Sequence, residues 1–137
     1  MLLTARQFAI LKAARDHGPL LAKKKKIPAT RSALDGYTFD SKVERDRYVE
    51  LKLLAQAKTI LNLEVHPIYP LEINGVKIGR YTPDFTYLER RRAGDYPPYV
   101  RVVEDVKSVF TAKDRTYRRM LKLMLAIHKI AVRTVIR

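Results

Sequence analysis

The sequence contains no cysteine and no tryptophan, and only five of its 137 residues are glycine. Without cysteine the protein can form neither disulfides nor zinc–thiolate sites, and a reducing intracellular compartment is expected. No apolar stretch approaches the length needed to cross a bilayer, and residues 1–6 lack the charged segment and apolar run of a signal peptide. No basic amphipathic helix rich in Trp and Phe is present either. These absences predict a cytoplasmic protein without a membrane partner.

Acidic residues are scarce relative to basic ones. The chain has 28 Lys and Arg against 14 Asp and Glu, which gives a formal net charge of +14 and a pI near 10.2. A small protein this basic normally has a polyanionic partner, because Lys and Arg release the counterions condensed on phosphates. Nucleic acid is therefore the expected partner. The competing interpretation, an anionic membrane surface, would call for the amphipathic helix that the sequence lacks.

The N-terminal part reads as an extension to the main domain. Residues 4–16 have the apolar spacing of a helix that ends at His17-Gly18-Pro19. The run Lys23, Lys24, Lys25, Lys26 follows, with Arg31 just beyond it. Such a run is either a solvated linker or an arm that lies along phosphates. We therefore divide the chain into an extension over 1–34 and a domain over 35–137.

Within 35–137 the hydrophobic period changes between helix-like and strand-like segments. Ser41 and Glu44 fit a capping box at a helix start, and Asn74-Gly75 is a strong hairpin pattern. In order, we expect a turn at Asp35-Gly36, a helix over 41–57, strands over 60–65, 68–73 and 76–88, a loop over 90–98, a strand over 99–109, a helix over 112–128 and a strand over 130–136. This order predicts an α/β domain with a mixed sheet.

Two acidic residues lie in segments that the fold can bring together. Strand alternation puts Asp105 and Lys107 on one face and Glu104 on the other, and it puts Asp84 on the face opposite Tyr81. If the two strands are neighbours, Asp84 and Asp105 meet near one end of the sheet. Charged groups inside a Val-rich strand are costly to bury unless they are paired or bind a metal. Two carboxylates beside a Lys suit Mg²⁺, with Mn²⁺ as a substitute.

A longer string of residues carries a family resemblance. Pro83-Asp84 followed by Asp105-Val106-Lys107 matches the PD-(D/E)xK signature, and the wider string adds Phe39-Asp40-Ser41-Lys42, Glu44, Tyr48, Glu50-Leu51-Lys52-Leu53-Leu54 and Val103-Glu104. Over residues 35–137 the sequence resembles the restriction-endonuclease-like nucleases, in particular small phage-type endonucleases of the Holliday-junction-resolvase or recombination kind. The resemblance implies a core of helix, three-stranded meander, helix and strand.

The resemblance also implies roles for the residues that match the motif. Asp84 and Asp105 would be metal ligands, Lys107 the catalytic lysine, and Glu44 the third acid. Other readings remain open: Asp84 could start a turn, Asp105 and Lys107 could be a cross-strand ion pair, and Glu44 could be a capping-box acid alone or in addition.

The remaining polar residues are less specific. The last helix opens with a group that is either a solvated basic face or a phosphate-contacting surface, namely Lys113, Arg115, Tyr117, Arg118 and Arg119. The histidines, His17, His66 and His128, are scattered without metal-ligand spacing, which argues against a zinc or His-metal site.

These features predict a Mg²⁺-dependent endonuclease that hydrolyses DNA phosphodiester bonds. Its substrate would be double-stranded or branched DNA such as a Holliday junction, in phage recombination or DNA processing. It would act in the host cytoplasm if phage-encoded, and it could act as a homodimer. The alternatives are a sequence-specific or transposase-associated endonuclease of the same fold, and a non-catalytic basic nucleic-acid-binding module, because the fold does not choose the substrate.

Overall fold

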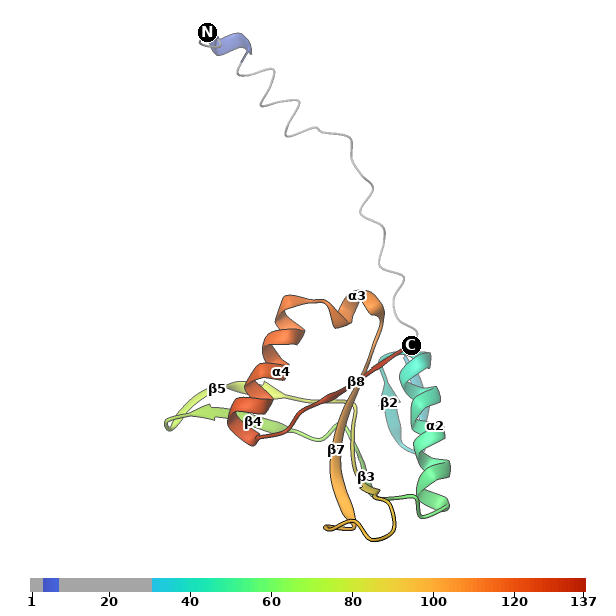
Figure 1. Ribbon diagram of the computed structural model, residues 1–137. Coiled ribbons are helices and arrows are strands. Elements are labelled where there is room, and N and C mark those ends of the chain that lie inside the picture. Colours follow the sequence, from blue (N-terminus) through green and yellow to red (C-terminus); the bar gives the residue numbers. More distant parts are fainter. Residues whose placement is uncertain (1–3, 8–30) are drawn as a thin grey trace.

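A central mixed sheet lies between two helices in the computed structural model, which describes residues 4–7 and 31–137 (Figure 1). The elements of the described part are β1 (Ser32–Leu34), β2 (Tyr37–Phe39), α2 (Lys42–Gln56), β3 (Ile60–Val65), β4 (Tyr69–Ile73), β5 (Val76–Tyr81), β6 (Phe85–Arg90), β7 (Tyr99–Lys107), α3 (Val109–Ala112), α4 (Arg115–His128) and β8 (Arg133–Ile136). The expected α/β domain with a mixed sheet is confirmed.

The central sheet has the strand order β3-β6-β7-β8. The pairs β3–β6 and β6–β7 are antiparallel, whereas β8 returns through α4 and pairs parallel to β7. Strands β4 and β5 form a separate antiparallel ribbon, and β1 and β2 form another. Strand β1 lies just upstream of residue 35, the expected start of the main domain.

Two tight turns follow the sequence pattern. In the β1–β2 hairpin, Asp35 and Gly36 have φ of 52° and 81°, and in the β4–β5 ribbon Asn74 and Gly75 have φ of 51° and 79°. Positive φ at both central residues is typical of the type I′ turn that matches strand twist. Both expected turns are confirmed.

Helix α2 begins where the sequence predicted. Ser41 is its N-cap, and its hydroxyl oxygen accepts a hydrogen bond from the Glu44 backbone N–H at 3.1 Å. The buried side of the helix packs against the sheet through a cluster of aromatic and aliphatic side chains that includes Phe39, Tyr48, Leu51, Ile60, Phe85, Tyr87 and Val102. A second cluster, built around Leu71, Tyr81 and Met124, joins α4 to the β4–β5 ribbon.

Three expected elements differ from those observed. The strand expected over 76–88 is two strands, because residues 82–84 interrupt the pairing and Pro83 has no N–H to donate. The helix expected over 112–128 is also divided: α3 ends at Ala112, and Asp114 caps a new helix by accepting from the Tyr117 N–H at 3.1 Å. The last strand starts at Arg133 rather than Ile130.

The N-terminal expectations lie mostly outside the described residues. Of the helix expected over 4–16, the structure describes residues 4–7, of which 5–7 are helical. The Lys23–Lys26 run is not among the described residues. In the part of the chain that is described, no helix is long and apolar enough to span a bilayer.

A buried ion pair ties α2 to the central strand β7. The Arg47 guanidinium donates to both carboxylate oxygens of Glu104, from Nε at 2.8 Å and from Nη2 at 3.0 Å. The Glu104 side chain is completely buried, and it also accepts from the Tyr87 hydroxyl at 2.7 Å. Glu104 is therefore a structural residue on the α2 side of the sheet, opposite Asp105 and Lys107.

Removing Arg47 should destabilise the fold strongly, because it leaves the Glu104 charge buried without its cation. We expect Arg47→Ala to lower the free energy of unfolding by about 3–5 kcal/mol in urea titrations. The control is Arg91→Ala, which breaks the exposed Arg91–Asp95 pair at 3.6 Å and should cost less than about 1 kcal/mol. Equal losses in the two variants would refute the structural role of the buried pair.

Candidate functional site

Asp84 and Asp105 lie opposite each other at one end of the sheet. Phe85 pairs with Glu104 in the antiparallel β6–β7 register, so the residue before Phe85 faces the residue after Glu104. The Asp84 Oδ2 accepts a hydrogen bond from the Val106 backbone N–H at 2.7 Å. The short β6–β7 connection thus brings together the two acids that the sequence singled out.

Asp105 is held from both sides by donors. It is 2% exposed, its Oδ2 accepts from the Tyr81 hydroxyl at 2.5 Å, and its Oδ1 lies 2.9 Å from the Lys107 Nζ. Burial and the hydrogen bond to Asp105 raise the pKa of the Tyr81 phenol, so that this group remains a donor. The carboxylate of Asp105 is therefore fixed in place.

Lys107 is positioned by α4. Its ammonium lies over the Tyr117 ring, 5.1 Å from the centroid, and the Tyr117 hydroxyl is 2.8 Å from the Thr134 hydroxyl on β8. Burial lowers the pKa of Lys107, but the hydrogen bond and the charge of Asp105 outweigh it, and the pKa is raised overall. The lysine is therefore a cation, held beside a carboxylate and an aromatic face.

The position of Tyr117 corrects one expectation. The sequence grouped it with the exposed basic residues of the last helix, but it is 8% exposed and its hydroxyl is engaged with Thr134. The helix begins at Arg115, so Tyr117 points inward from its first turn. Tyr117 supports Lys107 and does not belong to the surface that could contact phosphates.

Glu44 projects from the first turn of α2 into the same site. Its Oε2 accepts from the Asp40 backbone N–H at 3.1 Å, and its Oε1 lies 2.6 Å from the His66 Nε2. Ligand atoms of Glu44, His66 and Asp84 all lie within 4.8 Å of one another. Glu44 thus helps to cap the helix, and its position beside Asp84 is compatible with the further role of a third acid.

The closeness of the acids is electrostatically unfavourable without a cation. Burial raises the pKa of Asp84 well above its usual range, and the neighbouring Asp105 and Glu44 carboxylates raise it further, against the effect of the Val106 N–H. A divalent cation would relieve this repulsion and would compete with the proton on Asp84. The donor set of carboxylate oxygens, with one imidazole nearby, fits a hard divalent cation.

Glu44, Asp84 and Lys107 line a cleft with a volume of about 350 Å³, whereas Asp105 is buried and does not line it. The cleft is lined by Asp40, Ser41, Val43, Glu44, Asp84, Val106, Lys107, Ser108, Thr111 and Arg137. Helix α2 begins, β7 ends and the C-terminus lies at this end of the sheet (Figure 1).

The other residues singled out in the sequence do not enter the cleft. Lys113, Arg115, Arg118 and Arg119 are exposed on α4 and just before it, and Arg31 is exposed upstream of β1. Arg115, Arg118 and Arg119 line a second hollow, of about 420 Å³, together with Lys122.

Sequence reasoning missed two residues of the site, His66 and Tyr81. The spacing of the histidines argued against a His-metal site, but the structure brings His66 to the acids, because its backbone N–H donates to the Asp84 carbonyl at 2.9 Å just beyond the β3–β6 ladder. Tyr81 was expected on the face opposite Asp84, but strand alternation does not extend across the interruption at 82–84. Spacing within one element could reveal neither residue, since each reaches the acids from another strand.

The comparisons with known proteins yield a family match. The family model described as "Protein of unknown function (DUF1064)" matches residues 24–135, which include every residue of the cleft except Arg137. No curated protein and no solved structure matches the chain.

Proposed function

The chain belongs to the DUF1064 family, and we propose that it is a Mg²⁺-dependent endonuclease of the restriction-endonuclease-like, PD-(D/E)xK type. The observation that carries the proposal is the grouping of Asp84, Asp105 and Lys107 at one end of two paired strands, with the Lys107 Nζ 2.9 Å from Asp105 and with Asp84 and Lys107 lining the cleft. Glu44 adds a third carboxylate from α2.

The order of elements supports the same proposal. Helix α2 is followed by the antiparallel strands β3, β6 and β7, then by α4 and the parallel strand β8. This order agrees with the helix, three-stranded meander, helix and strand of the nuclease core, with the β4–β5 ribbon inserted between the first two strands of the meander.

We assign two roles to these residues: the acids hold a cation, and Lys107 assists hydrolysis. Asp84, Asp105 and Glu44 would hold Mg²⁺, or Mn²⁺ as a substitute, and such an ion polarises the phosphate and makes its bound water more acidic. Lys107 places a fixed positive charge beside Asp105, where it can orient the attacking water and offset charge that develops on the phosphate. His66 contacts Glu44 and would orient that carboxylate.

A non-catalytic binding module explains the cleft less well. The net charge of +14 suits either function, but carboxylates that face a phosphate backbone repel it. A protein that only binds DNA would gain nothing from Glu44 and Asp84 in its cleft, with Asp105 buried next to Asp84. An enzyme gains a cation site, and this difference favours the nuclease. Sequence-specific or transposase-associated cutting would use the same groups.

Cleavage of DNA by the purified full chain tests the proposal. We expect Mg²⁺ or Mn²⁺ to support cutting of at least one of linear, nicked, flap and four-way DNA on a denaturing gel, and EDTA to abolish it. RNA of the same sequence serves as the comparison for sugar preference. If none of these substrates is cut with either ion, the nuclease proposal fails and the binding module takes its place.

A further inference from the structure

One exposed aromatic residue stands beside the cleft without a packing role. Phe110, on α3, is 87% exposed. Its neighbours Ser108 and Thr111 line the cleft, and Lys107 lies three residues before it. In the described part of the chain, its ring makes none of the aromatic contacts that join the core rings. Single exposed apolar residues are common, but Phe110 lies in the chain between Ser108 and Thr111, which both line the cleft.

The backbone around Phe110 is held firmly. The Ser108 hydroxyl caps α3 by accepting from the Thr111 N–H at 3.2 Å, and the Ala112 N–H donates to the Ser108 carbonyl at 2.9 Å. A ring presented by a fixed turn loses little freedom when it binds a flat ligand. The exposed Phe110 ring can therefore stack against a planar group of a ligand.

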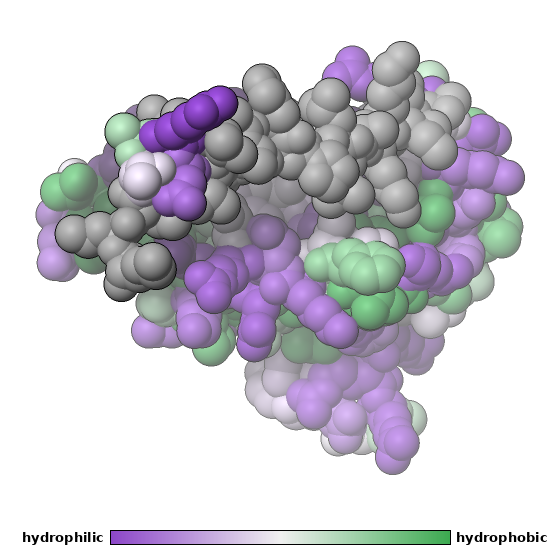
Figure 2. All heavy atoms as spheres, turned by 90° about the horizontal axis from the view of Figure 1, so that it is seen from above, coloured by the Kyte–Doolittle hydropathy of each residue, from purple (hydrophilic) through white to green (hydrophobic). Residues whose placement is uncertain are grey.

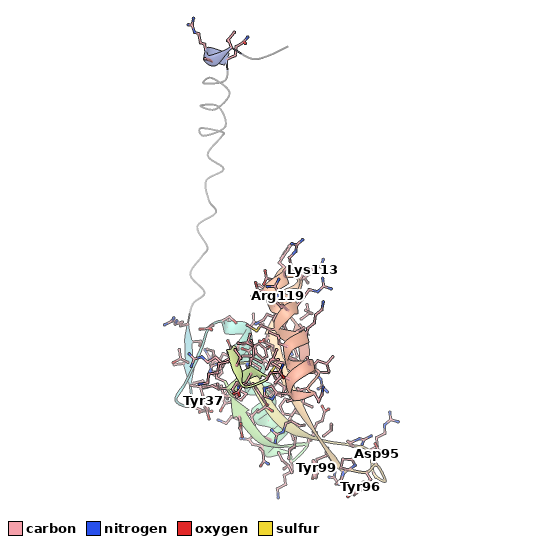
Figure 3. The ribbon with its side chains drawn as sticks, turned by 90° about the vertical axis from the view of Figure 1, so that its left-hand side faces the viewer. Tyr37, Asp95, Tyr96, Tyr99, Lys113 and Arg119 are labelled. Carbon is pink, nitrogen blue, oxygen red and sulfur yellow. The ribbon has the colours of Figure 1, made fainter. Side chains whose placement is uncertain are left out.

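Basic residues follow Phe110 closely along the chain, on a helix that contacts α3. Helix α3 contacts α4, whose first two turns carry Arg115, Arg118, Arg119 and Lys122 around the 420 Å³ hollow. Figure 3 shows Lys113 and Arg119 projecting from this end of α4. Figure 2, seen from above, shows hydrophilic and hydrophobic side chains side by side on the part of this face that the grey residues do not cover.

We propose that Phe110 is a stacking platform for an unpaired base of the DNA substrate, and that Arg115 and Arg118 hold the phosphates beside that base. An aromatic ring flanked by cations is the arrangement that binds single strands, since every base has a flat face to stack and every nucleotide a phosphate. A continuous duplex offers no free base face. The inference rests on the proposed nuclease function and names its substrate class: DNA with a single-stranded or splayed segment at the cleft.

Binding without turnover tests this inference on the full chain. Fluorescence anisotropy in Ca²⁺ would compare a single strand, a forked duplex and a fully paired duplex of one sequence. We expect Phe110→Ala to weaken binding of the first two by about 5- to 150-fold, the range for removal of one stacked base, and to leave the paired duplex nearly unchanged. Phe110→Trp should retain the affinity, and Phe110→Leu, which keeps apolar bulk but lacks the ring, should not.

The matched control is Tyr96→Ala. Tyr96 is 92% exposed and lies at the opposite end of the molecule from Lys113 and Arg119 (Figure 3). Its removal should change none of the three affinities. Equal loss for forked and paired DNA in Phe110→Ala, no loss at all, or full affinity in Phe110→Leu would each overturn the stacking role.

The salt dependence of DNA binding tests the proposed phosphate contacts of Arg115 and Arg118. Replacing Arg115 and Arg118 by Ser should weaken single-strand binding and lower the slope of log K against log salt by up to about 0.7 for each phosphate that the protein no longer neutralises. Arg90→Ser with Arg92→Ser removes the same charge at the other end of the sheet and should leave this slope nearly unchanged. Equal slopes in the two double variants would place the phosphates elsewhere.

The two proposals fail in distinguishable ways. If the wild type binds forked DNA through Phe110 but cuts nothing in Mg²⁺ or Mn²⁺, the nuclease proposal fails and the stacking platform stands as part of a binding module. If the wild type cuts DNA and Phe110→Ala binds forked DNA as well as the wild type does, the stacking inference alone fails.

Discussion

Asp84→Ala should reduce DNA cleavage in Mg²⁺ by about 10³-fold or more, equivalent to about 4 kcal/mol at the barrier. Asp84 is central to the expected cation site, since it lies between Asp105 on the facing strand and Glu44 on α2. A cation held there acts mainly on charge that develops in the transition state. Steady-state or single-turnover cleavage of the best substrate would give the ratio.

The affinity of Asp84→Ala for DNA should be equal to or higher than that of the wild type. Removing Asp84 takes a negative charge away from the cleft, so binding in EDTA should be equal to or tighter than that of the wild type. A purely structural role would lower affinity and thermal stability together with cleavage. Unaltered binding without cutting therefore separates a catalytic group from a folding defect.

Lys107→Ala should lower cleavage by about 10²- to 10⁴-fold, the range for one positioned proton-transfer or charge-stabilising group. It removes one cation of 28, so DNA affinity should change little. Asp95→Ala and Lys77→Ala serve as matched controls, because both residues are exposed and neither lines the cleft. If Asp84→Ala and Lys107→Ala cut as well as these controls, the active site is elsewhere.

The pairing of Asp84 with Asp105 was open to prediction for a local reason. Asp105 lies on a strand with clear alternation, and Asp84 directly precedes Phe85, the first residue of the paired strand. The loop between the two strands is too short for a parallel crossover, so antiparallel neighbours were the simplest arrangement. The capping position of Ser41 and the turn at Asn74-Gly75 were predictable in the same way, because a few adjacent residues determine each of them.

The rest of the site depends on contacts between distant segments. His66 reaches Glu44 because β3 pairs with β6, with Val65 opposite Phe85, and the β4–β5 ribbon intervenes between them in sequence. Nothing in the sequence around His66 specifies that register. Tyr117 was misassigned because the start of α4, which turns its ring inward under Lys107, depends on the Asp114 cap.

The cation site should also appear in thermal stability. Mg²⁺ or Mn²⁺ at about 100 times its dissociation constant should stabilise the fold by about 2.7 kcal/mol, or roughly 10 °C in Tm for a chain of this size. Asp105→Asn keeps the shape of the side chain but removes a ligand charge, so its shift should be much smaller. Asp95→Asn, on the distant loop, should shift as the wild type does. Equal shifts in all three proteins would contradict the site.

The rise in Tm that Mg²⁺ causes should grow with pH, whereas the stability of the metal-free protein should fall. Since the pKa of Asp84 is raised above its unfolded value near 4, its proton stabilises the metal-free fold at low pH, and that stabilisation is lost as the pH rises toward the raised pKa.

Protons and Mg²⁺ compete for the same carboxylates. Differential scanning fluorimetry between about pH 5 and about pH 9 should therefore show a rising Mg²⁺ shift in the wild type and a flat one in Asp84→Asn. A shift independent of pH in the wild type would mean that the cation binds away from the Asp84 and Asp105 pair.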